Sequence, residues 1–261
     1  MTMLQPWAWI DAVRDLFAVK TIGVVYQPLV DPRTGVVVGH EALARFRDTQ
    51  GRAIAPDRVF DALHGAGPGI LFAAEVALKR FQIRCAPAEG LLFVNFDPCA
   101  LAGLEAGRAQ RVLDDLLALR PRVVVELIEN THTAHVDLVE RTTRDLHARG
   151  IPLALDDIGA PGTLLSLYQM SLAGFLKFDR QWLQHWGKDR PLLDSLLAYA
   201  QATRKRTVLE GVETEEQLKI ACDSGFDLIQ GFLFRERFLG FEGPLSALSQ
   251  GPSCLRSVAV A

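Results

Sequence analysis

Short apolar runs alternate with longer mixed segments along most of the chain, a pattern typical of strands that are followed by helices. The apolar runs predict strands at residues 22–30, 36–46, 91–96, 123–128, 152–156, 174–178, 207–209 and 228–230. The remaining segments predict helices at residues 6–18, 56–64, 70–86, 109–119, 134–149, 164–170, 192–204, 215–224 and 243–248. Pro32 and Gly35 suit a reversal between the first two strands, so the fold is expected to open with a hairpin.

The order of these elements predicts an α/β fold. Repeated strand and helix units with apolar, β-branched strands favour a parallel sheet that helices cover on its outer side. About eight strands favour closure into a barrel, and such barrels reach the 261 residues of this chain as one domain. We expect residues 1–18 to form a helix that packs on the barrel, residues 19–250 to form the barrel domain, and residues 251–261 to form a loose tail.

Polar residues stand at the carboxyl ends of most predicted strands, which are otherwise apolar. They are Glu41, Asn95, Glu126, Asp156, Asp157, Lys177, Glu210 and Gln230. In a barrel these ends converge on the face that carries the catalytic groups. Any one of these residues is explained by the exit of a strand into solvent, but the whole set favours a shared site.

A cluster of carboxylates needs cations, because each buried and unpaired charge costs roughly several kcal/mol. Oxygen ligands from Glu, Asp and Asn suit hard ions such as Mg²⁺ or Mn²⁺. Two such ions activate a water and stabilise the charge that develops during phosphoryl transfer. The pattern therefore favours a metal-dependent reaction at a phosphodiester.

The overall charge narrows the choice of partners. A net charge of -3 does not supply the basic field with which a protein grips a long nucleic acid, so a phosphate ligand should be small or bridged by metal. No apolar run is long enough to span a membrane, and the start of the chain lacks the pattern of a secretory signal. The expected location is the cytoplasm, without membrane attachment.

A series of motifs occurs in a fixed order along the chain. They are Tyr26-Gln27-Pro28, Glu41-Ala42-Leu43-Ala44-Arg45, Asn95, Glu126-Leu127-Ile128-Glu129, Asp156-Asp157-Ile158-Gly159, Lys177-Phe178-Asp179-Arg180, Glu210-Gly211-Val212-Glu213-Thr214 and Gln230-Gly231-Phe232. From about Val19 to Phe238 the chain thereby resembles the EAL-domain family of cyclic di-GMP phosphodiesterases. The resemblance implies a modified TIM (β/α)₈ barrel with one antiparallel strand, often a homodimer. Such a protein hydrolyses cyclic di-GMP to linear pGpG with two Mg²⁺ or Mn²⁺ ions, and Ca²⁺ is expected to inhibit it.

The resemblance also implies a role for each matching residue. The metal ligands would be Glu41, Asn95, Glu126, Asp156 and Asp157, with Asp156 bridging both ions. Lys177 would orient the attacking water, and Glu210 would bind that water or act as general base, so Lys177, Glu210 and Glu41 form the catalytic set. The substrate-binding residues would be Gln27, Leu43, Arg45, Asp179, Glu213 and Gln230. Glu129 would support the loop after the two aspartates. Thr214 and Gln217 also have the spacing of a helix capping box.

The chain departs from the family pattern after Asp157. The loop reads Ile158-Gly159-Ala160-Pro161-Gly162-Thr163, where active members carry approximately Phe-Gly-Thr-Gly-Tyr-Ser, and Pro161 restricts its path. A proline that often follows the segment ending at Phe234 is absent as well. Two alternatives to the phosphodiesterase therefore stay open. One is a receptor that binds cyclic di-GMP or a protein partner without hydrolysis, and the other is a barrel hydrolase for a different phosphodiester.

Overall fold

The computed structural model describes residues 19–102, 106–119, 122–127, 136–163, 165–185, 190–246 and 256–257. The helix predicted at residues 6–18 and most of the tail predicted at residues 251–261 lie outside these ranges. The division of the chain into a helix, a barrel and a tail therefore stays a prediction. Among the helices that the structure describes, none is long and apolar enough to cross a membrane.

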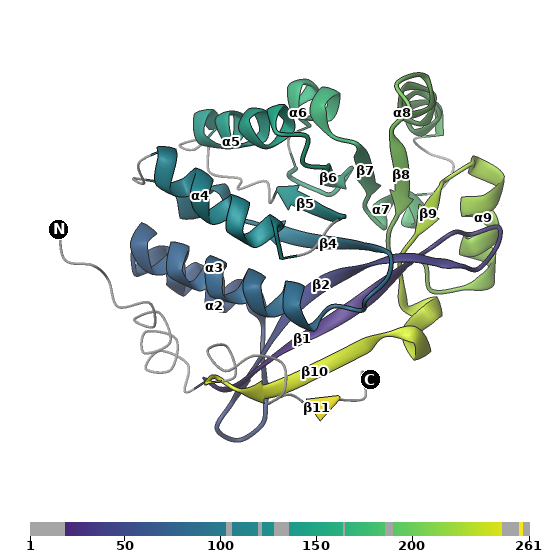
Figure 1. Ribbon diagram of the computed structural model, residues 1–261. Coiled ribbons are helices and arrows are strands. Elements are labelled where there is room, and N and C mark those ends of the chain that lie inside the picture. The colour runs from purple at the N-terminus through teal and green to yellow at the C-terminus, as the bar shows by residue number, and fades with distance from the viewer. Residues whose placement is uncertain are drawn as a thin grey trace.

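The described strands form a closed barrel with helices outside it (Figure 1). The barrel strands are β1 (Val19–Val30), β2 (Val37–Asp48), β4 (Leu91–Phe96), β5 (Val123–Leu127), β6 (Leu153–Ile158), β7 (Phe175–Phe178), β8 (Arg206–Leu209) and β9 (Leu228–Ile229). From β2 to β9 they lie parallel in this order. β1 lies antiparallel between β9 and β2 and closes the ring. The predicted TIM-like barrel with one antiparallel strand is thus confirmed.

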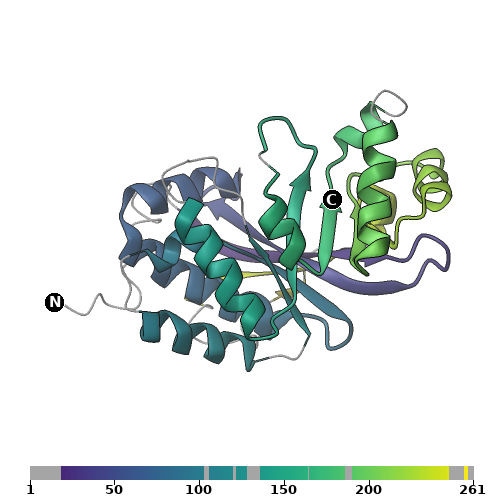
Figure 2. The same ribbon diagram turned by 90° about the horizontal axis from the view of Figure 1, so that it is seen from above.

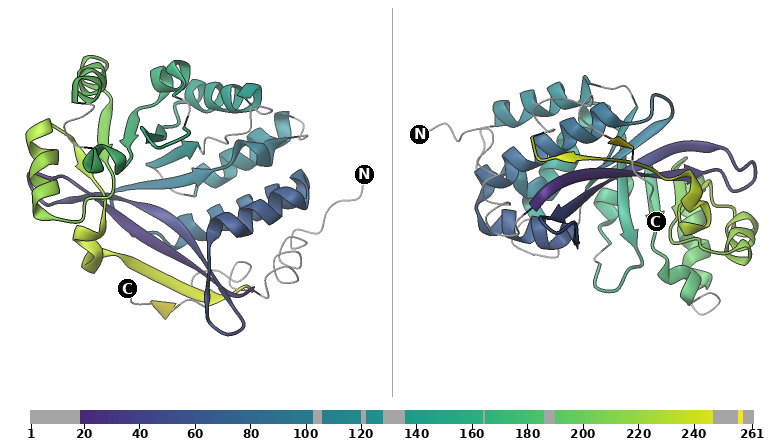
Figure 3. Two further views of the ribbon diagram at one scale, coloured as in Figure 1. Left: turned by 180° about the vertical axis from the view of Figure 1, so that it is seen from behind. Right: turned by 90° about the horizontal axis from the view of Figure 1, so that it is seen from below.

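Three additional strands were not predicted: β3 (Ala53–Ile54), β10 (Leu239–Pro244) and β11 (Arg256–Ser257). The helix predicted at residues 243–248 is wrong at its start, because Gly243 and Pro244 end β10. β10 runs antiparallel along β1 (Figure 3), and Phe241 packs edge-on against Tyr26 with ring centroids 6.2 Å apart. Pairing with the edge of β1 decides the structure here, since Gly and Pro give this segment a weak helix preference.

Helices cover the outside of the barrel (Figure 2). They are α2 (Pro56–Gly65), α3 (Pro68–Cys85), α4 (Ala106–Leu117), α5 (Val136–Ala148), α6 (Leu167–Leu172), α7 (Gln181–Gln184), α8 (Arg190–Ala202) and α9 (Glu215–Ser224). Short α7 and the 3₁₀ helices η1 (Pro98–Leu101) and η3 (Phe232–Arg237) were not predicted. The capping box of α9 is confirmed, because Gln217 N donates to Thr214 Oγ1 and Thr214 N donates to Gln217 Oε1.

An apolar layer fills the inside of the barrel. Its buried members are Leu29, Phe93, Val124, Ala154, Phe175, Val208 and Leu228. Phe93 and Phe175 meet edge to face across the interior, with ring centroids 5.0 Å apart. Because side chains alternate along a strand, the residue two positions further on faces the interior as well. This second interior layer lies at the carboxyl ends of the parallel strands and forms the mouth of the barrel.

Candidate active site

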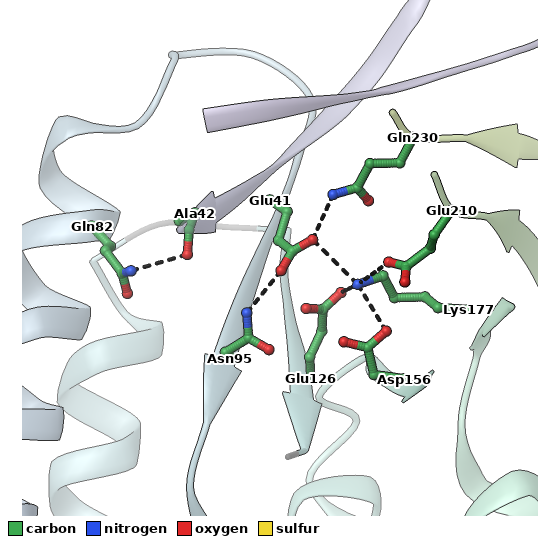
Figure 4. A network of polar contacts seen from close by, with 9 residues as sticks. All are labelled: Glu41, Ala42, Gln82, Asn95, Glu126, Asp156, Lys177, Glu210 and Gln230. Carbon is green, nitrogen blue, oxygen red and sulfur yellow. Dashed lines mark hydrogen bonds and ion pairs between the residues drawn. The ribbon is translucent and has the colours of Figure 1, made fainter. Parts of the chain in front are cut away.

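The mouth of the barrel is polar because the parallel strands carry polar side chains at the inward-facing position that follows the apolar layer (Figure 4). Asn95 stands two residues after Phe93, and Lys177 stands two residues after Phe175. The same step leads from the apolar layer to Glu126, Asp156, Glu210 and Gln230. Glu41 completes the set from β2, where it is the ladder partner of Gln27 on β1. The strand geometry therefore gathers side chains that lie up to 189 residues apart in the sequence.

Lys177 lies at the centre of this group and is 1% exposed. Its Nζ lies 3.2 Å from Glu41 Oε2 and 2.9 Å from Glu126 Oε1. The same atom lies 3.0 Å from Asp156 Oδ1 and 2.9 Å from Glu210 Oε1. One ammonium thus faces four carboxylates. Burial disfavours the charge of Lys177, but the four carboxylates prevail and hold its pKa well above the usual value.

Two side-chain amides orient Glu41. Asn95 Nδ2 donates to Oε1 at 2.8 Å, and Gln230 Nε2 donates to Oε2 at 2.6 Å. Burial acts to raise the pKa of this carboxyl, yet Lys177 and the two amides outweigh it and lower the pKa. Glu41 is therefore held as a carboxylate in one orientation at the centre of the mouth.

The other carboxyls are less well compensated. Burial and the neighbouring Glu41 raise the pKa of Glu126 well above its usual value. Burial, opposed by Lys177 but reinforced by Asp156, raises the pKa of Glu210 to about 8. Within the described part of the chain, Glu126 Oε2 is buried and accepts no hydrogen bond, while Glu126 Oε1 and Asp156 Oδ1 are buried and share the single ammonium of Lys177. These oxygens fit a site for cations, because a hard ion would compensate the charge that a single lysine leaves unbalanced.

A β-bulge brings the two adjacent aspartates to the same site. Neighbouring residues of a regular strand point to opposite faces, so Asp156 and Asp157 would normally diverge. Here β6 uses three steps from Leu155 to Ile158 where β7 uses two, and Asp157 takes a left-handed φ of 54°. The extra residue re-aims the side chains. One carboxylate oxygen each from Asp156, Asp157 and Glu210 then lie within 4.8 Å of one another, a spacing suited to a shared metal ion.

Burial also acts on Asp157. Together with the charge of Asp156, it raises the pKa of the Asp157 carboxyl to about 6.

Two cavities open beside this cluster. One of about 270 Å³ is lined by Gln27, Glu41, Leu43, Asp156, Lys177, Asp179, Arg180, Glu210, Gly211 and Gln230. The other, of about 320 Å³, is lined by residues 42–45 of β2, by α2 and α3, and by Asn95, Asp156 and Asp157. Leu43 and Asp156 line both cavities, so the acidic cluster lies between two spaces that a ligand can enter.

The structure thus brings together most of the residues that the sequence singled out. Arg45 is exposed and lines the second cavity, where its guanidinium also bonds Ala44 O. Asp179 lines the first cavity and accepts a hydrogen bond from Gln181 N at the start of α7. Glu213 is exposed and lines neither cavity, and its backbone N–H donates to Gln217 Oε1. Glu129 lies outside the described residues.

A buried ion pair on α3 was missed by the sequence reasoning. Glu75 is 0% exposed and Lys79 is 3% exposed, with Lys79 Nζ 3.5 Å from Glu75 Oε2. Both residues line the second cavity together with Gln82. The pair lies on a helix, whereas the polar pattern in the sequence marks strand ends. The signal that could have found the pair is a glutamate and a lysine at i and i+4 on the apolar face of a helix.

Fold and site together define an α/β barrel whose mouth carries a cluster of carboxylates around one buried lysine. The chain belongs to the EAL domain family, whose model matches residues 10–237. It is 26% identical over 218 residues to the cyclic di-GMP phosphodiesterase PdeL of Escherichia coli (strain K12), which covers 80% of this chain. The match spans 60% of PdeL, so this chain corresponds to only part of that relative.

Solved structures agree with this assignment. The PaMucR phosphodiesterase in complex with c-di-GMP has a TM-score of 0.64 at 26% identity, over 88% of this chain and 96% of that one. A manganese and cyclic di-GMP complex of BlrP1 from Klebsiella pneumoniae shares the fold, with a TM-score of 0.60 at 23% identity over 93% of this chain and 57% of that one.

Proposed function

We propose that this protein hydrolyses cyclic di-GMP to linear pGpG with two divalent ions, Mg²⁺ or Mn²⁺. The observation that carries the proposal is the unbalanced cluster at the mouth, where one ammonium faces four carboxylates and the buried Glu126 Oε2 has no donor among the described residues. Such a cluster is costly unless cations bind it. Membership of the EAL family, together with the c-di-GMP complex of PaMucR, supports cyclic di-GMP as the ligand.

The residues divide into three roles. Glu41, Asn95, Glu126, Asp156 and Asp157 would hold the ions. When bound, the ions would lower the pKa of a water and offset the charge of the phosphate. Lys177 orients the attacking water, and Glu210 takes up its proton, because Lys177 Nζ lies 3.0 Å from Asp156 Oδ1 and a Glu210 oxygen lies within 4.8 Å of an Asp156 oxygen. A general base must lie within hydrogen-bond reach of the proton that it accepts.

The substrate is expected to lie across the two cavities. Arg45 lines the second cavity and follows Glu41 on β2. Its planar guanidinium can donate two parallel hydrogen bonds to a phosphate. Gln27, Leu43, Asp179 and Gln230 line the first cavity. The proposal includes a homodimer in the cytoplasm, an arrangement that the resemblance and the sequence pattern favour.

A receptor without turnover, for cyclic di-GMP or a protein partner, is the second candidate. It is favoured by the altered loop after Asp157, in which Ala160, Pro161 and Gly162 follow Gly159. A loop of different shape can leave the ligands present and yet hold them slightly out of place, which costs orders of magnitude in rate.

The test is detection of pGpG by chromatography after incubation with cyclic di-GMP and Mg²⁺, Mn²⁺ or Ca²⁺ in parallel. Product is expected with the first two ions, and neither Ca²⁺ nor Glu41→Ala should support it. Glu242→Gln is the matched control, since this carboxylate bonds Thr21 and Arg47 away from the mouth. If the wild type forms no more pGpG than Glu41→Ala but still binds cyclic di-GMP, the receptor replaces the enzyme.

A further inference from the structure

The bulge that presents Asp157 ends at Ile158, and the carbonyl of Ile158 accepts two hydrogen bonds, one from the residue after β7 and one from α7. Asp179 N donates to Ile158 O at 3.1 Å. Trp182 Nε1 donates to the same oxygen at 2.7 Å. A backbone oxygen directly after a strained aspartate is thus tied to the segment that begins with Lys177. Trp182 is the only side chain of the described residues that donates to it.

The indole of Trp182 also occupies the space beside Gly159. Gly159 has a φ of 91°, and a Cβ added there would lie 2.3 Å from Trp182 Nε1 and 2.7 Å from Cε2. The ring itself is held by Phe178, which it meets edge-on with centroids 6.2 Å apart. Gly159 is therefore required both for its conformation and for the close approach of the tryptophan.

The loop beyond Gly159 has little else to fix it. Ala160 N donates to Asp157 O at 3.0 Å, and Thr163 N donates to Ala160 O at 3.2 Å. Both bonds lie within the loop itself. In the described part of the chain, no side chain of residues 158–163 forms a hydrogen bond, so the indole is the side chain that anchors this segment to the barrel.

We infer that Trp182 is a positioning residue that holds the β6 bulge, so that Asp156 and Asp157 present their carboxylates to one cation site. The inference rests on the proposed metal-dependent function. Trp182, on α7, thereby anchors a loop whose altered sequence supplies no side-chain hydrogen bond of its own within the described residues. Groups that hold metal ligands in place typically contribute about tenfold to a hundredfold to metal affinity.

The test compares Trp182→Phe with Tyr26→Phe. The first variant keeps an aromatic ring and removes the N–H that bonds Ile158. The second removes a hydroxyl that bonds Gln82 O at 2.6 Å, so it also deletes one bond from an aromatic side chain to a backbone carbonyl, but away from β6. Gly159→Ala perturbs the indole contact from the loop side and should reproduce the effect of Trp182→Phe.

Mn²⁺ binding is measured by electron paramagnetic resonance of the free ion, and amide exchange by mass spectrometry. Trp182→Phe should weaken Mn²⁺ binding about tenfold and speed exchange at Ala160 and Thr163, while Tyr26→Phe leaves both unchanged. Unchanged Mn²⁺ affinity in Trp182→Phe, or equal weakening in Tyr26→Phe, overturns the inference. If the wild type binds no Mn²⁺, the proposed function fails, and exchange then tests the anchor alone: unchanged loop exchange in Trp182→Phe overturns it.

Discussion

The same strands build two layers inside the barrel, one apolar and the other charged. In the lower layer, Phe93 and Phe175 pack against aliphatic neighbours and leave no polar group to satisfy. In the layer directly above, Lys177 faces four carboxylates, and Glu126 Oε2 is buried without a donor from the part of the chain that the structure describes. The lower layer stabilises the fold, whereas the upper one carries charge that the fold does not compensate. Uncompensated charge at this position is the mark of a functional site.

The largest effect is expected from Glu126→Gln, which tests whether the upper layer is kept for activity rather than for stability. Loss of one cation ligand should lower kcat on the order of 10²–10³-fold, in the range found when one charge-stabilising group is removed. The folded-state pKa of Glu126 lies above its ordinary value, so its ionised form opposes folding at any pH above that ordinary value. Metal-free Glu126→Gln should therefore melt at or above the temperature of the wild type.

Calorimetry without metal and chromatography with Mn²⁺ measure these two properties on one sample. A variant that loses both activity and stability would show that Glu126 serves the fold, and the contrast between the layers would disappear.

Phe93→Ala tests the lower layer. Phe93 is 0% exposed, and truncation of a buried phenylalanine to alanine typically costs about 3–5 kcal/mol of unfolding free energy. The polar set above it stays complete, so turnover at a temperature where the variant is folded should fall far less than in Glu126→Gln. Urea denaturation and pGpG formation are the measurements, with Phe46→Ala in the outer core as control. If folded Phe93→Ala is inactive, the lower layer also sets the geometry of the mouth.

The contrast between the layers explains how much could be predicted from the sequence. An apolar run that ends in a polar residue indicates that the strand leaves the apolar layer for the mouth, and Asn95, Glu126, Asp156 and Lys177 were predicted in this way. The bulge at Asp157 could not be predicted, since it arises from pairing with β7. The Glu75 and Lys79 pair was missed because it lies on a helix. β10 was missed because pairing with β1 outweighs its local sequence.

Metal should stabilise the upper layer by compensating its charge. Mn²⁺ at 100 times its dissociation constant should add about 2.7 kcal/mol to the unfolding free energy for one site. Asp156→Asn should lose most of this increase, because Asp156 contributes to the oxygen cluster and lines both cavities. Thermal unfolding with and without Mn²⁺ measures the difference, and Asp48→Asn controls for loss of a carboxylate that caps a turn instead. Equal stabilisation of wild type and Asp156→Asn would place the ion elsewhere.

The smallest effects are expected from substitutions in the segment 210–214, which carries both Glu210 of the site and Thr214, the N-cap of α9. Thr214→Ala removes the N-cap of α9, so it should cost about 1 kcal/mol of stability and leave turnover intact. Glu213→Gln should change neither property, because Glu213 is exposed and lines neither cavity. Denaturation and pGpG formation by both variants, beside Glu210→Gln as the inactive reference, measure this. Weaker substrate binding in Glu213→Gln would show that Glu213 contacts the substrate, as the sequence predicted. The ligand would then extend beyond the two cavities toward α9.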